Sequence, residues 1–138
     1  MRIVLDVNII LSALIRDSIT RKIIMKSGFD LYFPEPSLHK INKYKEYIIK
    51  KSGLGEEDFN IILTDLFKRI RLISRNKIER NWNKAKEAME HIDEEDIVFI
   101  ATALSLEDSI IWSDDADFDK QDKVRVLKTK DVMRLFME

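Results

Sequence analysis

Residues 93–118 read DEEDIVFIATALSLEDSIIWSDDADF, and they contain an apolar helix pattern, an apolar strand pattern and a run of aspartates. The helix pattern over residues 94–106 is apolar on every side, which indicates a helix packed centrally against a sheet. The strand pattern over residues 109–112 is apolar without alternation, as in parallel strands that are buried on both faces. The three aspartates that follow exceed what a turn needs, because adjacent negative charges repel each other. This stretch therefore predicts a parallel α/β sheet with a functional site beside one strand end.

The rest of the chain repeats this alternation of strands and helices. Apolar runs predict further strands over residues 2–5, 31–33, 70–73 and 124–127. Amphipathic patterns predict helices over residues 8–14, 20–26, 38–51, 56–67, 77–89 and 130–137. The expected N-caps are Asn8, Ser37, Asp93 and Thr129. This order predicts an α/β protein, a three-layer α/β/α sandwich around a central parallel sheet of about five strands, and residues 1–138 are expected to form a single domain.

The composition is that of a chain that can bury a core. Hydrophobic residues make up 45% of the 138 residues and charged residues 36%, so the chain is expected to fold rather than to be disordered. Neither a membrane-spanning segment nor a signal peptide is expected, because no apolar run is long enough. Cysteine is absent, which excludes disulfides and thiolate metal sites and fits a cytoplasmic protein. His39 and His91 are too few and too far apart for a histidine-based zinc site.

Charge is balanced overall but uneven along the chain. The sequence has 24 basic and 25 acidic residues, and the net charge of −1 neither requires nor excludes a polyanionic partner. Lys and Arg crowd the first half of the chain. The simplest interpretation is a set of solvated helix faces. The alternative is a surface that follows a phosphate backbone, which gains weight if the protein cuts phosphodiesters.

Aspartates from three separate segments are expected to meet at one edge of the sheet. Asp6 follows the first predicted strand, Asp96 lies in the first turn of the apolar helix, and Asp115 follows the fourth strand. In open α/β sheets, sites form outside the carboxyl ends of the strands. Two carboxylates about 4–5 Å apart repel by roughly 3–4 kcal/mol at an effective dielectric constant near 20, so protons or cations must neutralise them. Because all the ligands are oxygen atoms, the expected ion is Mg²⁺ or Mn²⁺.

Each of these acidic residues also has a structural interpretation. Asp6 and Asn8 are common in strand-to-helix turns, where they form caps and Asx-turns. Asp93 at a helix N-terminus is stabilising by about 0.3–1 kcal/mol and is assigned to capping. Asp96 lies inside the first turn, from which it can project into the crevice, and is assigned to the site. For the aspartates after the fourth strand we favour the functional interpretation, with Phe118 anchoring their loop in the core.

The motifs Asp6-x-Asn8, Asp93-x-x-Asp96 and Ser113-Asp-Asp115-x-Asp117-Phe118 together resemble those of the PIN domain family. Chain length, strand–helix order and the absence of cysteine also match, so the resemblance covers essentially the whole chain. It implies an Mg²⁺- or Mn²⁺-dependent ribonuclease, in many members the toxin of a toxin–antitoxin pair and commonly a homodimer. The implied partners are RNA, an antitoxin protein and a second copy of the chain.

The same resemblance implies roles for individual residues. Asp6, Asp96 and Asp115 match the metal-binding acids of the family, and Asp117 matches an additional acid. The polar residues around them, Asn8 and Ser113, are expected to support the acids and contact substrate.

One position departs from the family pattern. The family usually carries a Glu early in the helix after the second strand, and Lys40 stands there in this chain. Glu35 precedes the helix and can reach in only from the turn, whereas Glu46 lies about 240° around the helix from Lys40, on the wrong face. If Lys40 points into the crevice, its ammonium group partly replaces a cation and weakens metal binding. If it points outward, one metal site persists on the aspartates alone.

Three functions fit these observations. The preferred hypothesis is hydrolysis of single-stranded RNA by a metal-activated water, with Lys40 contacting a phosphate. The second is a degenerate nuclease that acts as an RNA- or protein-binding module, and Lys40 is its whole motivation. The third is an aspartate-nucleophile phosphatase, which ranks last because Asn8 occupies the position of the second acid and cannot deliver a proton.

Overall fold

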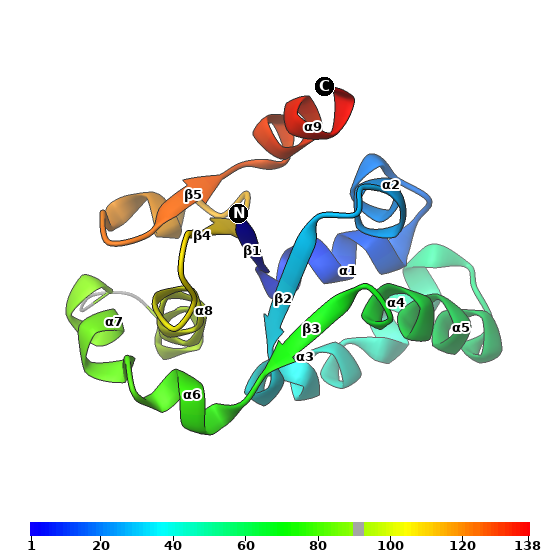
Figure 1. Ribbon diagram of the computed structural model, residues 1–138. Helices are drawn as coiled ribbons and strands as arrows, with labels where there is room; N and C mark the ends of the chain where they lie inside the picture. Colours follow the sequence, from blue (N-terminus) through cyan, green and yellow to red (C-terminus); the bar gives the residue numbers. More distant parts are fainter. Residues whose placement is uncertain (90–92) are drawn as a thin grey trace.

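A five-stranded sheet forms the centre of the computed structural model, which describes residues 1–89 and 93–138 (Figure 1). Its strands are β1 (Arg2–Leu5), β2 (Asp30–Pro34), β3 (Ile70–Ile73), β4 (Ser109–Trp112) and β5 (Arg125–Leu127). They lie in the order β3-β2-β1-β4-β5, and each neighbouring pair is parallel. The predicted parallel α/β sheet is therefore confirmed. His91, which was judged too far from His39 to form a zinc site with it, lies outside the described residues.

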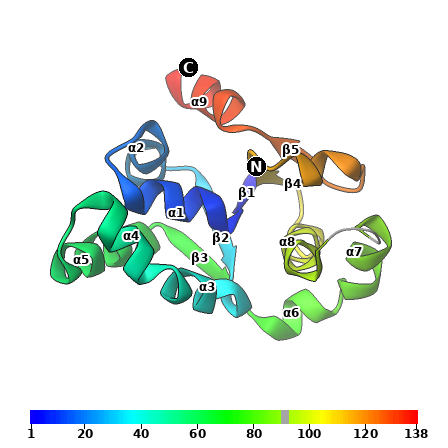
Figure 2. The same ribbon diagram turned by 180° about the vertical axis from the view of Figure 1, so that it is seen from behind.

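Helices cover both faces of this sheet. Figures 1 and 2 show α6, α7 and α8 on one face and α1, α2, α4 and α5 on the other, which confirms the three-layer arrangement. The described helices are α1 (Val7–Ile15), α2 (Ile19–Lys26), α3 (Leu38–Lys43), α4 (Lys45–Ser52), α5 (Glu56–Phe67), α6 (Arg75–Glu79), α7 (Trp82–Ala88), α8 (Glu94–Leu104) and α9 (Thr129–Met137). Two short 3₁₀ helices, η1 (Glu35–Ser37) and η2 (Ala116–Lys120), follow β2 and β4.

The strand order reverses direction between β1, the central strand, and its neighbour β4. Leu5 at the end of β1 pairs with Trp112 at the end of β4. The backbone N–H of Asp6 donates to the Trp112 carbonyl at 3.1 Å, so Asp6 and Ser113 leave the sheet side by side. This reversal point is where open α/β sheets build their sites, because the chain diverges there and leaves a crevice.

Helix α8 is the central helix, as its apolar sequence predicted. Its residues 97–103 are all buried, and the helix contacts β1, β2 and β4. The Phe99 ring packs edge-on against Phe33 of β2 at 5.9 Å between centroids and against Phe118 at 6.3 Å. Phe118 is fully buried, so the predicted anchoring of the loop after β4 is confirmed.

Two predicted helices are each broken in two. The helix expected over residues 38–51 is divided at Tyr44 into α3 and α4, and the helix expected over residues 77–89 is divided into α6 and α7. Both α3 and α4 contact α1, and both α6 and α7 contact α8. The direction of each short helix is therefore set by the helix against which it packs. The hydrophobic pattern of the sequence does not show where the bend between the two pieces lies. The other elements end within two residues of their predicted bounds.

Two of the four predicted N-caps, Asn8 and Thr129, are wrong, and a third, Ser37, has the predicted position but makes no side-chain capping bond. Helix α1 begins directly after Asp6, which places Asn8 inside the first turn, because Asp6 accepts the first helical bond from Ile9 at 3.0 Å. Ser37 ends η1, leads directly into α3 and makes no capping bond with its side chain. Helix α9 begins at Thr129 itself. Asp93 is confirmed as a cap, since its carboxylate accepts from the Glu95 N–H at 3.1 Å.

Thr129 has a different role, because its hydroxyl joins β4 to the start of α9. It accepts from the indole N–H of the fully buried Trp112 at 2.9 Å and donates to Asp114 at 2.6 Å. The other carboxylate oxygen of Asp114 accepts from the Thr129 backbone N–H at 2.8 Å. Both carboxylate oxygens of Asp114 thus accept hydrogen bonds from Thr129.

Replacing Thr129 by Val is expected to lower the free energy of unfolding by about 1–3 kcal/mol, because it leaves the buried indole N–H of Trp112 without a partner. Thr129→Ser keeps the hydroxyl and should cost less than about 1 kcal/mol. Urea unfolding of the two variants measures the difference. Equal stabilities of the Val and Ser variants would contradict this role of the hydroxyl.

Candidate metal centre

Four aspartates meet where β1 and β4 end and α8 begins. Asp96, Asp115 and Asp117 each offer a carboxylate oxygen, and these three oxygens lie within 4.8 Å of one another. Asp6 is 2% exposed and lies close enough to both Asp96 and Asp115 for their charges to interact. These four residues are called the acidic centre below. The structure therefore brings together the acidic residues that sequence analysis assigned to the site.

A chain of hydrogen bonds holds one side of the acidic centre. The hydroxyl of Ser113, itself fully buried, donates to Asp6 Oδ2 at 2.8 Å. The same hydroxyl oxygen accepts from the Asp115 N–H at 3.0 Å. Asp115 Oδ1 in turn accepts from the Asp117 N–H at 2.9 Å. Ser113 thus links Asp6 after β1 to the loop after β4, which is the supporting place that was predicted for it.

The acidic centre has more negative charge than the fold neutralises. Burial, together with the charges of Asp6, Asp115, Asp93 and Asp117, raises the pKa of Asp96 to about 7. Burial also raises the pKa of Asp6, and the charge of Asp115 adds to that effect. The Ser113 hydroxyl and the backbone N–H groups at the start of α1 act in the opposite direction on Asp6. A carboxylate of this kind binds either a proton or a cation at neutral pH.

Within the described residues, the cations nearest to the acidic centre lie at its border. Lys120 Nζ lies 3.1 Å from Asp117 Oδ1, in an exposed pair. Over residues 1–89 and 93–138, no Lys or Arg lies within 4.0 Å of a carboxylate oxygen of Asp6, Asp96 or Asp115. Exposed pairs such as Lys120–Asp117 contribute only about 0–1 kcal/mol. Protein cations therefore leave most of the repulsion in place.

The donor set fits a hard divalent ion. All the side-chain donors are carboxylate oxygens, which suit Mg²⁺ and Mn²⁺. Octahedral ligands at about 2.0–2.1 Å from Mg²⁺ lie at most about 4.2 Å apart. Three ligands of one octahedron include at least two adjacent pairs about 3 Å apart, so the oxygens that lie within 4.8 Å of one another would need to close by up to about 2 Å, which side-chain rotation can supply.

Lys40 lies in the wall of the crevice beside the acidic centre. It lines a cavity of about 190 Å³ together with Asp6, Asn8 and Asp96. Its side chain is 9% exposed, and its Nζ lies 3.3 Å from Glu95 Oε2 and 5.7 Å from the centre of the Phe99 ring. Of the two orientations considered for Lys40, the inward one is therefore observed, with its ammonium group paired to Glu95.

Sequence analysis missed Glu95 as the partner of Lys40. It stands next to Asp96 in an acidic first turn, where a helix dipole alone explains negative charge. The only indication in the sequence was that a lysine expected at the crevice needs an acidic partner. That partner, Glu95, is 55 residues away in the chain. Asn8 is exposed and lines the same cavity as Lys40. Its contact with a substrate stays a prediction.

Comparisons with known proteins agree with this geometry. A family model described as the PIN domain matches residues 4–133. A solved structure, the crystal structure of VapBC2 from Rickettsia felis bound to a DNA fragment from their promoter, contains a chain with the same fold. The TM-score is 0.69 at 15% sequence identity, with 93% of this chain and 98% of that chain covered. No curated protein matches the chain.

The described part of the chain also lacks any helix with the length and apolar character needed to cross a membrane. The family match extends over nearly the whole chain, from before the first aspartate of the acidic centre to beyond the last. The chain belongs to the PIN domain family.

Proposed function

We propose that the protein is an Mg²⁺- or Mn²⁺-dependent endoribonuclease that hydrolyses phosphodiester bonds of single-stranded RNA. One observation carries the proposal: the oxygens of Asp96, Asp115 and Asp117 gather within 4.8 Å while the pKa of Asp96 is raised to about 7. A folded protein maintains such a cluster at a cost in stability, and a bound cation offsets that cost. Membership of the PIN domain family, whose members are generally nucleases, supports the reaction class.

The side chains of the acidic centre have different proposed roles. Asp6, Asp96 and Asp115 would hold the ion, and Asp117, whose carboxylate oxygen lies within 4.8 Å of those of Asp96 and Asp115, would be a further ligand or would orient water. The bound ion supplies Lewis acidity, lowers the pKa of a water and neutralises charge on the phosphoryl oxygens. Ser113 keeps Asp6 in its orientation through the 2.8 Å hydrogen bond. Asp96 releases its proton when an ion binds, so binding is coupled to pH.

Lys40 is proposed to contact a substrate phosphate at the border of the crevice, with exposed Asn8 also positioned to contact the strand. The side chain of Lys40 lines the same cavity as Asp6 and Asp96. The pairing with Glu95 restrains Lys40 without placing it among the metal-binding oxygens. This arrangement supports a site in which the aspartates bind the ion and the lysine meets the negatively charged strand.

The partners are proposed from the family and from the solved neighbour. That neighbour is a VapBC2 complex bound to a DNA fragment from its promoter. We propose that this chain is likewise the toxin of a toxin–antitoxin pair, binds an antitoxin protein, forms a homodimer and acts in the cytoplasm. Neither the single-domain organisation nor these assemblies depend on the metal chemistry, so they can be tested separately.

A second candidate function is a degenerate PIN domain that binds RNA or protein without cutting it. The observation that favours it is the buried Lys40, whose cation stands in the crevice wall beside the acidic centre. A fixed ammonium group at that place lowers the affinity of the crevice for a divalent ion. Metal binding therefore discriminates between the two candidates.

Asp96→Asn is expected to lower the cleavage rate of single-stranded RNA in the presence of Mn²⁺ by at least about 100-fold, because it removes a ligand from an ion that stabilises transition-state charge by several kcal/mol. Asp122→Asn is the matched control, since it removes an exposed carboxylate outside the acidic centre. A gel assay on a labelled oligonucleotide measures both variants. Equal rates for wild type and Asp96→Asn would reject the proposed mechanism.

Calorimetric titration with Mn²⁺ is expected to show saturable binding to the wild type. Lys40→Glu should bind the ion about tenfold more tightly, because a carboxylate replaces an ammonium group beside the acidic centre, and the neutral control Lys40→Gln should lie between the two. Asp96→Asn should bind at least about tenfold more weakly than the wild type. A wild type that binds no Mn²⁺ at millimolar concentration would favour the binding module over the enzyme.

Asp96→Asn is also expected to stabilise the metal-free protein in a pH-dependent manner. The pKa of Asp96 is about 7 in the folded chain against an ordinary value of 3.8, so its ionisation opposes folding. This penalty is absent below about pH 4, grows from about pH 4 to 7 and stays constant above. Urea unfolding in EDTA should therefore show the variant more stable than wild type by about 1–2 kcal/mol at pH 8, with solvent screening allowed for, relative to the difference at pH 4. A pH-independent difference would contradict the raised pKa.

A further inference from the structure

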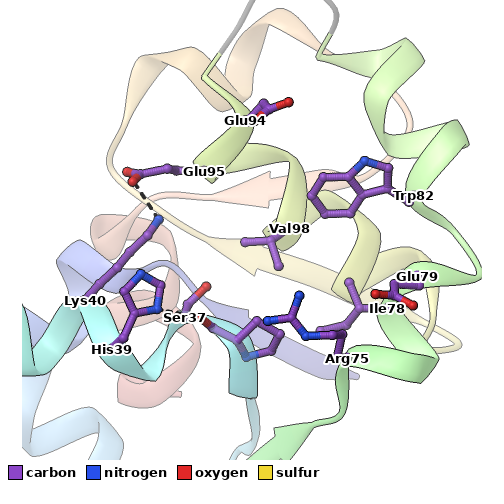
Figure 3. A pocket seen from close by; sticks show the side chains of 11 residues that line it. Ser37, His39, Lys40, Arg75, Ile78, Glu79, Trp82, Glu94, Glu95 and Val98 are labelled. Atoms are coloured by element: carbon purple, nitrogen blue, oxygen red, sulfur yellow. Dashed lines mark hydrogen bonds and ion pairs between the residues drawn. The ribbon is translucent and has the colours of Figure 1, made fainter.

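A second, larger cavity lies beside the crevice of the acidic centre. Its volume is about 390 Å³, which is within the range of about 300–1,000 Å³ that small-ligand sites occupy. Figure 3 shows Lys40, His39 and Glu95 on one side, Trp82, Ile78 and Glu79 on the opposite side, and Val98 of α8 between them. We call this space the Trp82 cavity.

The Trp82 cavity and the crevice share a wall. Lys40, His39 and Glu95 line both spaces, so the Lys40–Glu95 ion pair stands at their junction. A group that occupied the Trp82 cavity would therefore lie next to the crevice, as a nucleotide base lies next to the phosphate of the same nucleotide.

The walls of the Trp82 cavity suit a flat, partly apolar ring. Ile78 and Val98 are buried and present their side chains to the space, and Trp82 is only partly buried. Trp82 packs against the core and also borders the open cavity. Aromatic side chains that border such spaces stack on unpaired bases, which contributes about 1–3 kcal/mol per base.

The charges around the Trp82 cavity argue against a phosphate or an acidic peptide as its occupant. Lys40 and Arg75 are cationic, but three carboxylates, Glu79, Glu94 and Glu95, line the same space. An excess of carboxylates repels a phosphate and accepts hydrogen bonds from N–H donors. Exocyclic amino groups of adenine, guanine and cytosine are such donors, whereas uracil has no amino group.

We infer that the Trp82 cavity binds one unpaired, amino-bearing base of the RNA strand, next to the phosphate that enters the crevice. This inference rests on the proposed function, because it assigns the base that flanks the reacting phosphate. The base stacks on Trp82 with its amino group toward Glu79 or Glu94, and its phosphate passes Lys40. A base held in a duplex cannot enter the cavity, so the site selects single-stranded RNA.

The test uses full-length protein with Asp96→Asn in the background, which prevents cleavage. Short oligoadenylate and oligocytidylate are expected to quench Trp82 fluorescence on binding, and oligouridylate should bind at least about fivefold more weakly. In the same background, the anisotropy of a labelled oligoadenylate, a signal that does not depend on Trp82, should show binding weakened by about 5–100-fold in Trp82→Leu and largely retained in Trp82→Tyr. Trp112 is fully buried and provides a constant signal.

Two further measurements separate this inference from the proposed function. Mn²⁺ titration of Trp82→Leu with Asp96 intact should match the wild type, which shows that the variant is folded and that its acidic centre is unchanged. If the wild type cleaves RNA, and if Trp82→Leu and Trp82→Tyr bind and cleave RNA as well as the wild type does, the base site is rejected. The cavity would then be a site for a protein segment instead. If RNA binding depends on Trp82 while the wild type neither binds Mn²⁺ nor cleaves, the base site stands and the nuclease proposal falls.

Discussion

Electrostatic repulsion among carboxylates at the ends of β1 and β4 is the constraint on which the rest of the site depends. Four aspartates are held close together in a partly buried crevice, and the cations of the described residues that lie nearest to it are at its border. The fold maintains this arrangement through Ser113, whose hydroxyl ties Asp6 to the loop after β4. The raised pKa of Asp96 is the direct consequence of burial and of the charges around it. The site is therefore suited to bind a hard cation rather than to be stable without one.

The Lys40–Glu95 pair forms part of the crevice wall. Lys40 adds positive charge beside the acidic centre, and Glu95 Oε2 lies 3.3 Å from its Nζ. The pair also separates the crevice from the Trp82 cavity, so the two spaces differ in character. One is lined by aspartates and suits an ion with a phosphate. The other combines apolar walls with carboxylates and suits a base.

Local sequence patterns predicted the elements well and their junctions poorly. Apolar strands of four residues and the uniformly apolar α8 follow from burial on both sides, which depends only on residue type. The breaks near Tyr44 and between α6 and α7 depend on how each piece packs against α1 or α8. The role of Thr129 likewise depends on Trp112 and Asp114, which reach it only in the folded chain. Propensity is a local property, and tertiary contacts override it.

The sequence alone determined that aspartates would follow the ends of two central strands and open the apolar helix, because strand ends and helix starts are visible in the hydrophobic pattern. Parallel topology then required those residues to converge. Only the tertiary structure decided which carboxylates face one another, since Asp114 turns to Thr129 while Asp115 and Asp117 turn to Asp96. It also decided the pairing of Lys40 with Glu95 and the opening of a cavity at Trp82. The physical reason is that pairing and cavity formation depend on side-chain direction and on distances across the chain, and neither is encoded in spacing along it.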